Sequence, residues 1–146
     1  AAGPKNIIAA IRKIQSQSTS NPSSISQAAA VEALNGTQSF IKKRSKSFSD
    51  RRNFVVNYLN SIPGITCLMP KGAFYVFPSC KGLIGKKTQI KNDTDFVQKL
   101  LEKQNVAVVQ GSAFGLDGYF RISYATSMQK LKVAMVRIKL FCESLG

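Results

Sequence analysis

The sequence predicts an α/β protein of the two-layer α+β kind, in which helices pack on one side of a small sheet. Apolar residues recur at helical spacing in several long segments, whereas Tyr119–Tyr124 alternates between two faces as a half-buried strand does. The predicted elements follow the order helices, two strands, helix, two strands, helix. With 146 residues and 44% hydrophobic residues, the chain is large enough for one packed core.

The first part of the chain is predicted to be helical. A helix over Pro4–Ser16 has proline near its start, where the missing N–H costs nothing, and carries a stripe of isoleucines. A second helix over Ile25–Leu34 is rich in alanine, and Ser23 or Ser24 is placed to cap it. A third helix, Thr37–Leu59, carries arginines and lysines along its polar side.

The second part is predicted to contain the sheet and two further helices. Thr94 or Asp93 is predicted to cap one helix, which ends near Lys103, and Thr126 is predicted to cap the last helix, which carries a stripe of apolar residues. Turn residues separate four short runs that are typical of strands. These predicted strands are Ile65–Met69, Ala73–Phe77, Val106–Val109 and Tyr119–Tyr124.

The composition excludes several classes of site. Histidine is absent, which removes Ser-His-Asp and Cys-His catalysis and the commonest metal ligand, so no metal site is predicted. Three cysteines without a paired spacing indicate a reducing compartment and therefore the cytoplasm. We interpret Asp93 and Asp95 as acids that favour a helix start rather than as a catalytic pair. No apolar run is long enough to span a membrane, and no signal peptide is expected from the first residues.

The formal charge of +14 indicates anionic partners. The candidates are nucleic acid, an acidic membrane surface, and ligands that carry phosphate or carboxylate groups. A basic helix face over Ile41–Arg52 favours an alternative function, a non-enzymatic module that binds nucleic acid. Such a face is also typical of a helix side that is simply solvated.

Arg121 is the most informative candidate for a binding residue. It lies in the alternating strand, where Phe120 and Ile122 point to the predicted core and Arg121 points to the other face. A guanidinium in an apolar strand is costly unless it is paired. Arg121 therefore has a carboxylate partner in the protein, or it binds an anionic ligand through its planar fork, or it is a solvated arginine.

Three segments together carry a resemblance to a known family. They are QSTSNPSSISQAAAVEAL (Gln17–Leu34), PKGAFYVFP (Pro70–Pro78) and VAVVQGSAFG followed by GYFRISYATS (Val106–Ser127). In this order they resemble the C-terminal part of a class I aminotransferase of pyridoxal-phosphate fold type I, similar to aspartate aminotransferases. The resemblance implies a mostly antiparallel sheet, with residues 1–36 ending the large-domain helices and residues 37–146 forming the small domain.

The resemblance also implies roles for four residues. Arg121, in YFRISYA, corresponds to the arginine that binds the substrate α-carboxylate. Phe74 is expected to line the substrate entrance, unless it is an aromatic residue of the core. Ser20 and Asn21 match a loop that reaches the active site of a partner subunit, unless they form only a turn that caps a helix.

The expected enzyme transfers an amino group between an amino acid and a 2-oxo acid. Aspartate with 2-oxoglutarate is the implied pair, and a preference for prephenate or an aromatic substrate is the alternative. The enzyme is expected to be a homodimer with pyridoxal phosphate as cofactor. The cofactor lysine and most of the phosphate cup of the family lie upstream, so no catalytic or cofactor-binding residue is assigned in this chain. We expect this chain alone to bind no cofactor and to be inactive.

Overall fold

The computed structural model describes residues 1–85 and 87–145. The chain divides into two units, Ala1–Phe40 and Ile41–Gly146. The assignment of the segments before and after residue 36 to a large and a small domain stays a prediction, because compactness alone does not identify domains.

The first unit contains helices α1 (Lys5–Gln17) and α2 (Ser24–Asn35). Ser23 caps α2, because its side-chain oxygen accepts a hydrogen bond from the backbone N–H of Ser26 at 3.2 Å. Neither helix buries a single residue. The isoleucine stripe of α1 is therefore present as predicted, but it faces solvent within this chain.

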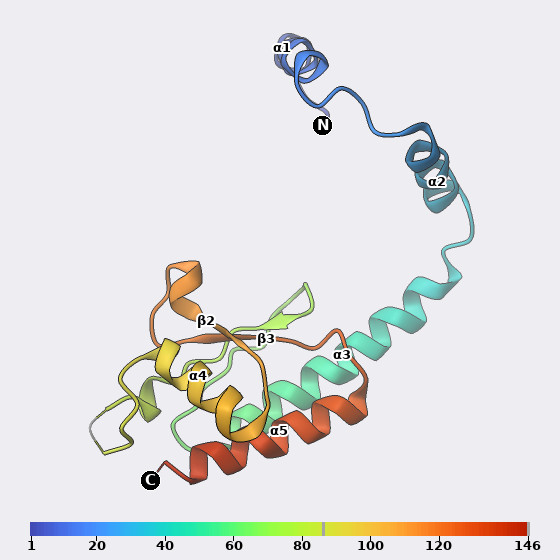
Figure 1. Cartoon of the computed structure of the whole chain (residues 1–146). Helices are drawn as coiled ribbons and strands as arrows, with labels where there is room; N and C mark the ends of the chain where they lie inside the picture. The colour runs from blue at the N-terminus through green and yellow to red at the C-terminus, as the bar shows by residue number, and fades with distance from the viewer. Residues whose placement is uncertain (86, 146) are drawn as a thin grey trace. The chain divides into compact units, whose positions relative to one another are not determined.

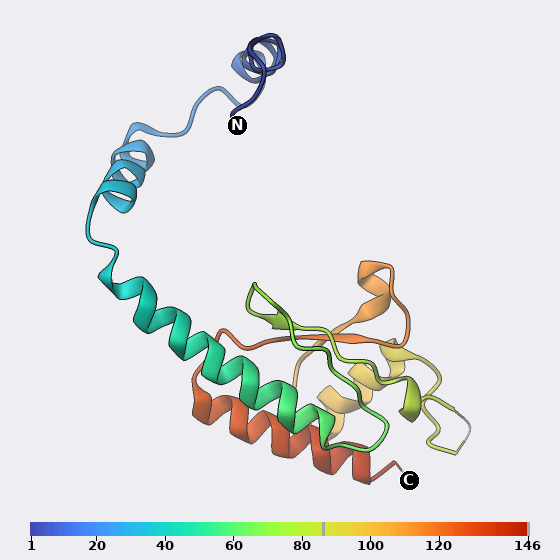
Figure 2. The ribbon, with the colours of Figure 1, turned by 180° about the vertical axis from the view of Figure 1, so that it is seen from behind.

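The second unit contains helices α4 and α5, all of α3 except its first two residues, and a three-stranded antiparallel sheet with the strand order β1-β3-β2. Figures 1 and 2 show α3 and α5 side by side on one side of this sheet. The predicted fold class is confirmed. The elements are α3 (Ser39–Asn60), β1 (Tyr75–Val76), α4 (Asp93–Gln104), β2 (Val109–Gln110), β3 (Phe120–Ser123) and α5 (Met128–Glu143), with short 3₁₀ turns η1 (Lys81–Leu83) and η2 (Gly111–Phe114).

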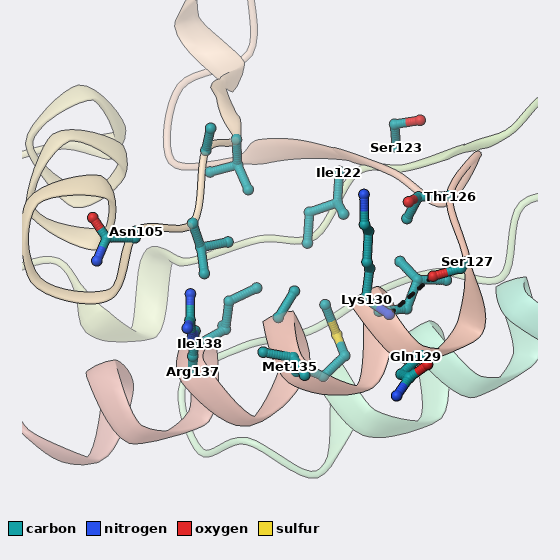
Figure 3. Close-up of a pocket in the computed structure, with 16 residues that line it drawn as sticks. Asn105, Ile122, Ser123, Thr126, Ser127, Gln129, Lys130, Met135, Arg137 and Ile138 are labelled. Atoms are coloured by element: carbon teal, nitrogen blue, oxygen red, sulfur yellow. Dashed lines mark hydrogen bonds between the residues drawn. The ribbon is translucent and has the colours of Figure 1, made fainter.

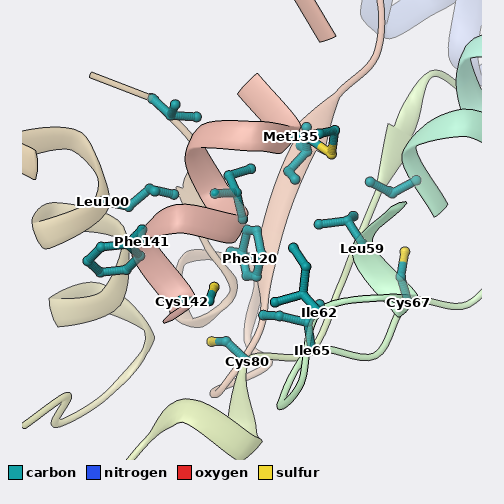
Figure 4. Packing of buried hydrophobic residues seen from close by; sticks show 14 of the residues in the cluster. Leu59, Ile62, Ile65, Cys67, Cys80, Leu100, Phe120, Met135, Phe141 and Cys142 are labelled. Atoms are coloured by element: carbon teal, nitrogen blue, oxygen red, sulfur yellow. The ribbon is translucent and has the colours of Figure 1, made fainter. Parts of the chain in front are cut away.

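The core lies between β3 and the three helices. Phe120 of β3 is fully buried, and Figure 4 shows it surrounded by Leu59 of α3, Leu100 of α4 and Met135 of α5. The face of the strand predicted to be buried is confirmed, since Ile122 is only 7% exposed. In the described part of the chain no helix is long and apolar enough to cross a membrane.

The predicted strand Ile65–Met69 is wrong. The side-chain amide of Asn60 donates to the Cys67 carbonyl at 2.9 Å, and its oxygen accepts from the Cys67 N–H at 2.7 Å. The backbone groups of Cys67 that a sheet ladder would use are therefore satisfied by a side chain. Only Thr66 of this run pairs in a strand-like way, as an isolated bridge to Ser79.

The residues predicted to cap the helices α4 and α5 are wrong, although α4 does begin at Asp93. Asn92, rather than Asp93 or Thr94, caps α4 by accepting from the Asp95 N–H at 2.8 Å. At α5 the cap is the side chain of Ser127, not that of Thr126. The strand predicted at Val106–Val109 is also displaced, since only Val109 and Gln110 pair with β3.

Candidate functional site

Arg121 projects from β3 on the face of the sheet opposite the core. The antiparallel register places Tyr75 opposite Ser123, two residues along β3, so Tyr75 shares this outer face with Arg121. The guanidinium carbon lies 4.5 Å from the centre of the Tyr75 ring and 4.3 Å from the centre of the Phe114 ring in η2. A cation over aromatic faces is favourable, so the two rings hold the guanidinium in place.

The guanidinium of Arg121 has no carboxylate partner within the described residues. The ion pairs found there join Lys46 to Asp50, Lys99 to Asp95, and Lys139 to Glu143. The first sequence-based interpretation, a protein carboxylate that neutralises Arg121, is therefore wrong for the described chain. The residue is half-buried, and aromatic rings rather than charged groups surround its guanidinium.

Aromatic side chains continue on both sides of Arg121. We call Phe74, Tyr75, Phe77, Phe114 and Tyr119 the aromatic row. The Phe77 ring stacks on Tyr119 with centroids 5.7 Å apart and meets Phe114 edge-on at 6.0 Å, while Phe74 contacts Tyr75 at 4.3 Å. Sequence reasoning did not assign Tyr75 or Phe114 to the site, although the alternation in GAFYVFP already placed Tyr75 on one face of its strand with Phe77.

Phe74 stands at one end of the aromatic row. Its side chain is 41% exposed, so it is not a core aromatic residue in this chain. Its carbonyl accepts a hydrogen bond from the Tyr124 N–H at 2.9 Å, which fixes the backbone beside β3. Phe74 and Arg121 both contact the ring of Tyr75.

Ser20 and Asn21 lie in the first unit, in the connection between α1 and α2, so they share no unit with Arg121. Ser20 adopts a left-handed backbone conformation with φ of 58°, and its N–H donates to the carbonyl of Gln15 at the end of α1 at 2.9 Å. Neither side chain caps α2, because Ser23 does. Both residues are exposed.

Asp93 holds the turn that carries Phe114. It lies in the first turn of α4, as predicted, but it is only 2% exposed, and its carboxylate accepts a hydrogen bond from the Ser112 N–H at 2.7 Å. Burial raises the pKa of the Asp93 carboxyl, but the hydrogen bonds from Ser112 and from the backbone of Asp93 and Gly118 outweigh burial and keep this pKa below its ordinary value. The sequence indicated the place of Asp93 in its helix and missed its contact with η2.

Glycine has two different functions in the loop that leads into β3. Gly115 and Gly118 have positive φ angles, of 75° and 78°, which glycine adopts without strain. Gly111 does not, and its requirement is different. A side chain at Gly111 would collide with the carbonyl of Leu116 and with Tyr119, so only glycine allows this close approach.

The basic side of α3 makes contacts within the protein. Arg51 lies over the Phe48 ring at 5.3 Å, and Arg52 donates to the carbonyl of Pro70 at 3.1 Å. Lys46 pairs with Asp50 one turn further along the helix. These contacts give no support to the alternative of a nucleic-acid module.

Two cavities lie apart from Arg121. The first, of 710 Å³, is bounded by α5, β3 and the segment 105–108, and Figure 3 shows apolar side chains such as Ile122, Met135 and Ile138 along it. The second, of 490 Å³, lies at the start of α4. No residue predicted for the site lines either cavity, and the described residues contain no cluster of metal ligands.

Comparison with known proteins gives the class of protein to which this fold belongs. The family model for aminotransferase class I and II matches residues 1–138. The chain belongs to this aminotransferase family.

Individual proteins to which the chain is similar are also aminotransferases. The chain is 56% identical to an aspartate aminotransferase of Rhizobium meliloti over its whole length, and 58% identical over 97% of its length to a probable aspartate/prephenate aminotransferase of Rhizobium leguminosarum. A crystal structure of aspartate aminotransferase from Rhizobium meliloti superposes with a TM-score of 0.94 at 56% identity, over all of this chain and 38% of that one. The chain spans 37% and 36% of the lengths of the two curated relatives.

The family uses pyridoxal phosphate, and two charged groups of the second unit, Lys81 and Asp93, do not fit this cofactor. A site for it needs a lysine to bind the aldehyde and a carboxylate opposite the ring nitrogen. Lys81 contacts the aromatic row, but it is exposed and lies over the Tyr119 ring at 5.0 Å. The buried carboxylate, Asp93, is already committed to Ser112. Lys81 and Asp93 therefore do not provide this pair of groups.

Proposed function

We propose that this chain is the substrate-carboxylate-binding part of a longer aminotransferase. In that enzyme Arg121 binds the α-carboxylate of the amino acid and of the 2-oxo acid. The bidentate contact holds the substrate by one end, so that its reacting carbon is presented in a fixed orientation. We call the longer protein the full-length enzyme.

The observation that supports this proposal is the setting of Arg121. Its guanidinium lies against the rings of Tyr75 and Phe114, and the salt bridges of the described chain do not include it. A planar cation held in this way offers two parallel N–H groups along one edge, which matches a carboxylate. A half-buried charge without a partner of opposite charge lowers the stability of the folded chain, so a ligand carboxylate that pairs with Arg121 would explain its presence.

Aspartate and 2-oxoglutarate are the proposed substrates. Names of relatives support this choice, since one is an aspartate aminotransferase and another a probable aspartate/prephenate aminotransferase. The aromatic row beside Arg121 also suits an aromatic substrate or prephenate, and this is the second candidate. Measuring kcat/KM of the full-length enzyme with 2-oxoglutarate and with prephenate as the amino-group acceptor decides between the two candidates.

We further propose that the full-length enzyme is a cytoplasmic homodimer, in which residues 1–36 end the large domain and residues 37–146 form the small one. Apolar side chains of α1 and α2 are exposed in this chain, and Ile25 and Leu34 of α2 are 82% and 80% exposed. Their exposure supports the proposal that other parts of the full-length enzyme cover these helices. In this arrangement Ser20 and Asn21 reach the active site of the partner subunit, and Phe74 lines the substrate entrance.

Pyridoxal phosphate would supply the electron sink for amino-group transfer, held by residues outside this chain. We expect this chain alone to bind no cofactor and to have no transaminase activity. Titrating it with pyridoxal phosphate should leave the visible spectrum equal to that of free cofactor plus exposed amines. A saturable new absorbance band that survives removal of free cofactor would contradict this expectation.

Replacement of Arg121 in the full-length enzyme tests the central proposal. Arg121→Ala should reduce kcat/KM by an amount equivalent to roughly 3–5 kcal/mol of transition-state stabilisation, because a buried charged contact is lost. Arg121→Lys should recover only part of this loss, since an ammonium group cannot form the planar double contact.

Arg137→Ala is a matched control for Arg121→Ala. Arg137 is an exposed arginine of the same unit, and its contact is with the carbonyl of Gln104. Its removal should leave kcat/KM unchanged. Equal kinetics for the Arg121→Ala and Arg137→Ala variants would remove Arg121 from the site.

A further inference from the structure

The turn that carries Phe114 is fixed to the rest of the unit at several points. The Gly111 N–H donates to the carbonyl of Tyr119 at 2.7 Å, and the Leu116 N–H donates to the carbonyl of Gly111 at 3.1 Å. Asp93 holds the next residue through the Ser112 N–H at 2.7 Å. The turn is therefore tied both to the segment that leads into β3 and to the first residue of α4.

The bond from Ser112 to Asp93 differs from the backbone bonds of the turn because its acceptor is charged and buried. Hydrogen bonds to an ionised group are shorter and stronger than neutral ones, and a buried carboxylate without donors would be very costly. The carboxylate therefore holds the Ser112 N–H tightly. Phe114 follows only two residues later, so the position of its ring depends on where Ser112 is held.

Phe114 is in turn the closer of the two rings that contact the Arg121 guanidinium, at 4.3 Å against 4.5 Å for Tyr75. The Phe114 side chain is 48% exposed, so core packing does not fix its place. Its own turn and its contact with the Phe77 ring hold it. A shift of the turn would remove one of the two ring contacts and let the arginine fork rotate.

We propose that Phe114 and Asp93 are positioning residues for the carboxylate clamp. Phe114 fixes the plane of the Arg121 guanidinium, and Asp93 acts through Ser112 to keep Phe114 in contact with it. The proposal rests on the function proposed for Arg121 and adds two residues that do not touch the substrate. It implies that the affinity for carboxylates depends on a side chain at the start of α4.

The test measures carboxylate binding in the full-length enzyme, with succinate as a dicarboxylate that cannot be transaminated. Phe114→Leu and Asp93→Ala should each weaken succinate binding by about three- to tenfold, the range expected when one cation–π contact is lost. Phe114→Tyr should bind succinate with the wild-type affinity, because it keeps an aromatic face over the guanidinium. KM for the amino acid should rise by the same factor as Kd for succinate.

Asp95→Ala is the matched control for Asp93→Ala. Asp95 lies in the same first turn of α4 and accepts a hydrogen bond from the Lys91 N–H at 2.9 Å, and its salt bridge is with Lys99 rather than with the turn of Phe114. Its loss should lower stability while leaving succinate affinity unchanged. A general loss of stability would weaken binding in both aspartate variants and would overturn the proposal.

A double variant tests whether Asp93 acts through Phe114. If it does, Asp93→Ala combined with Phe114→Leu should bind succinate no more weakly than Phe114→Leu alone, within about twofold. If the double variant weakens succinate binding by the product of the two single factors, Asp93 does not act through Phe114, and this part of the inference is overturned. Phe114→Leu lies outside the core, so it remains informative even where Asp93→Ala prevents folding.

The outcome with Arg121→Ala separates this inference from the function on which it rests. Loss of succinate binding in Arg121→Ala, with unchanged binding in Phe114→Leu and Asp93→Ala, overturns only the positioning roles. Unchanged binding in Arg121→Ala as well would overturn the proposed carboxylate clamp itself.

Discussion

The two units of this chain use the same helical pattern with opposite results. In the first unit, α1 repeats isoleucine at three-four spacing, yet no residue of α1 or α2 is buried. In the second unit, α5 uses a similar stripe and buries Leu131, Met135 and Ile138 in the core. An apolar stripe shows that a helix face needs cover, but it does not show what covers it.

The largest expected effect comes from the core of the second unit. Phe120→Ala should destabilise the chain by about 3–5 kcal/mol, because it removes a fully buried ring between three helices. Leu34→Ala, in the first unit, should change the free energy of unfolding by less than about 0.5 kcal/mol. Urea unfolding followed by circular dichroism measures both, and similar losses would show that the first unit is part of the same cooperative core.

The next effect comes from the buried carboxylate of the second unit. Asp93→Asn should cost about 1.5–3 kcal/mol at neutral pH, the usual range for a hydrogen bond to a charged group. The pKa of Asp93 is lower in the folded chain than its ordinary value, so its stabilisation is complete above that ordinary value and is lost as pH falls through the folded pKa.

Urea unfolding of wild type and Asp93→Asn at several pH values measures this effect. The difference in free energy of unfolding should be constant near neutrality and should shrink on acidification. Asp95→Asn is the control. Hydrogen bonding from Lys91 also lowers the pKa of Asp95, but its carboxylate is less buried, so its effect should be smaller. A difference for Asp93→Asn that grows in acid would mean that folding raises the pKa of Asp93 instead of lowering it.

A smaller effect distinguishes the isolated chain from the full-length enzyme. Ile14 is 71% exposed, so Ile14→Ala should leave the stability of this chain unchanged. In the full-length enzyme the same substitution should cost about 1–2 kcal/mol, because the proposed cover would bury these methyl groups. Parallel thermal melts of the two proteins measure this, and a neutral result in both would mean that α1 stays uncovered.

The smallest expected effect is on the rate at which a thiol reagent labels the three cysteines, all of which are buried in the second unit. Burial raises the pKa of Cys67 to about 11 and that of Cys80 and Cys142 to about 12, so little thiolate is present at neutral pH. Removal of residues 1–40 should leave the slow labelling by a thiol reagent unchanged. Faster labelling of the shortened chain would show that the first unit protects the core of the second.

Sequence reasoning predicted the orientation of Arg121 better than its surroundings. Alternation along Phe120–Ser123 was enough to separate Arg121 from the buried face, because a strand has a period of two residues. The Phe114 contact was missed, because it depends on how a glycine-rich turn folds back over the sheet. The side-chain bonds of Asn60 to Cys67 removed a predicted strand, and no local pattern distinguishes such a bond from a sheet ladder.

The sequence by itself determined the helical stripes, the two faces of β3, the absence of histidine chemistry and the family to which the chain is similar. The stripes and strand faces depend on residues close together in the chain, where spacing alone decides which side chains share a face. Only the tertiary structure decided that Tyr75 and Phe114 both contact Arg121 and that Asp93 is buried against Ser112. The contacts of Tyr75 with Arg121 and of Asp93 with Ser112 join residues far apart in the chain, and they exist only after the sheet and α4 have packed together. Phe114 is close to Arg121 in sequence, and it reaches the guanidinium only because its turn folds back over the sheet.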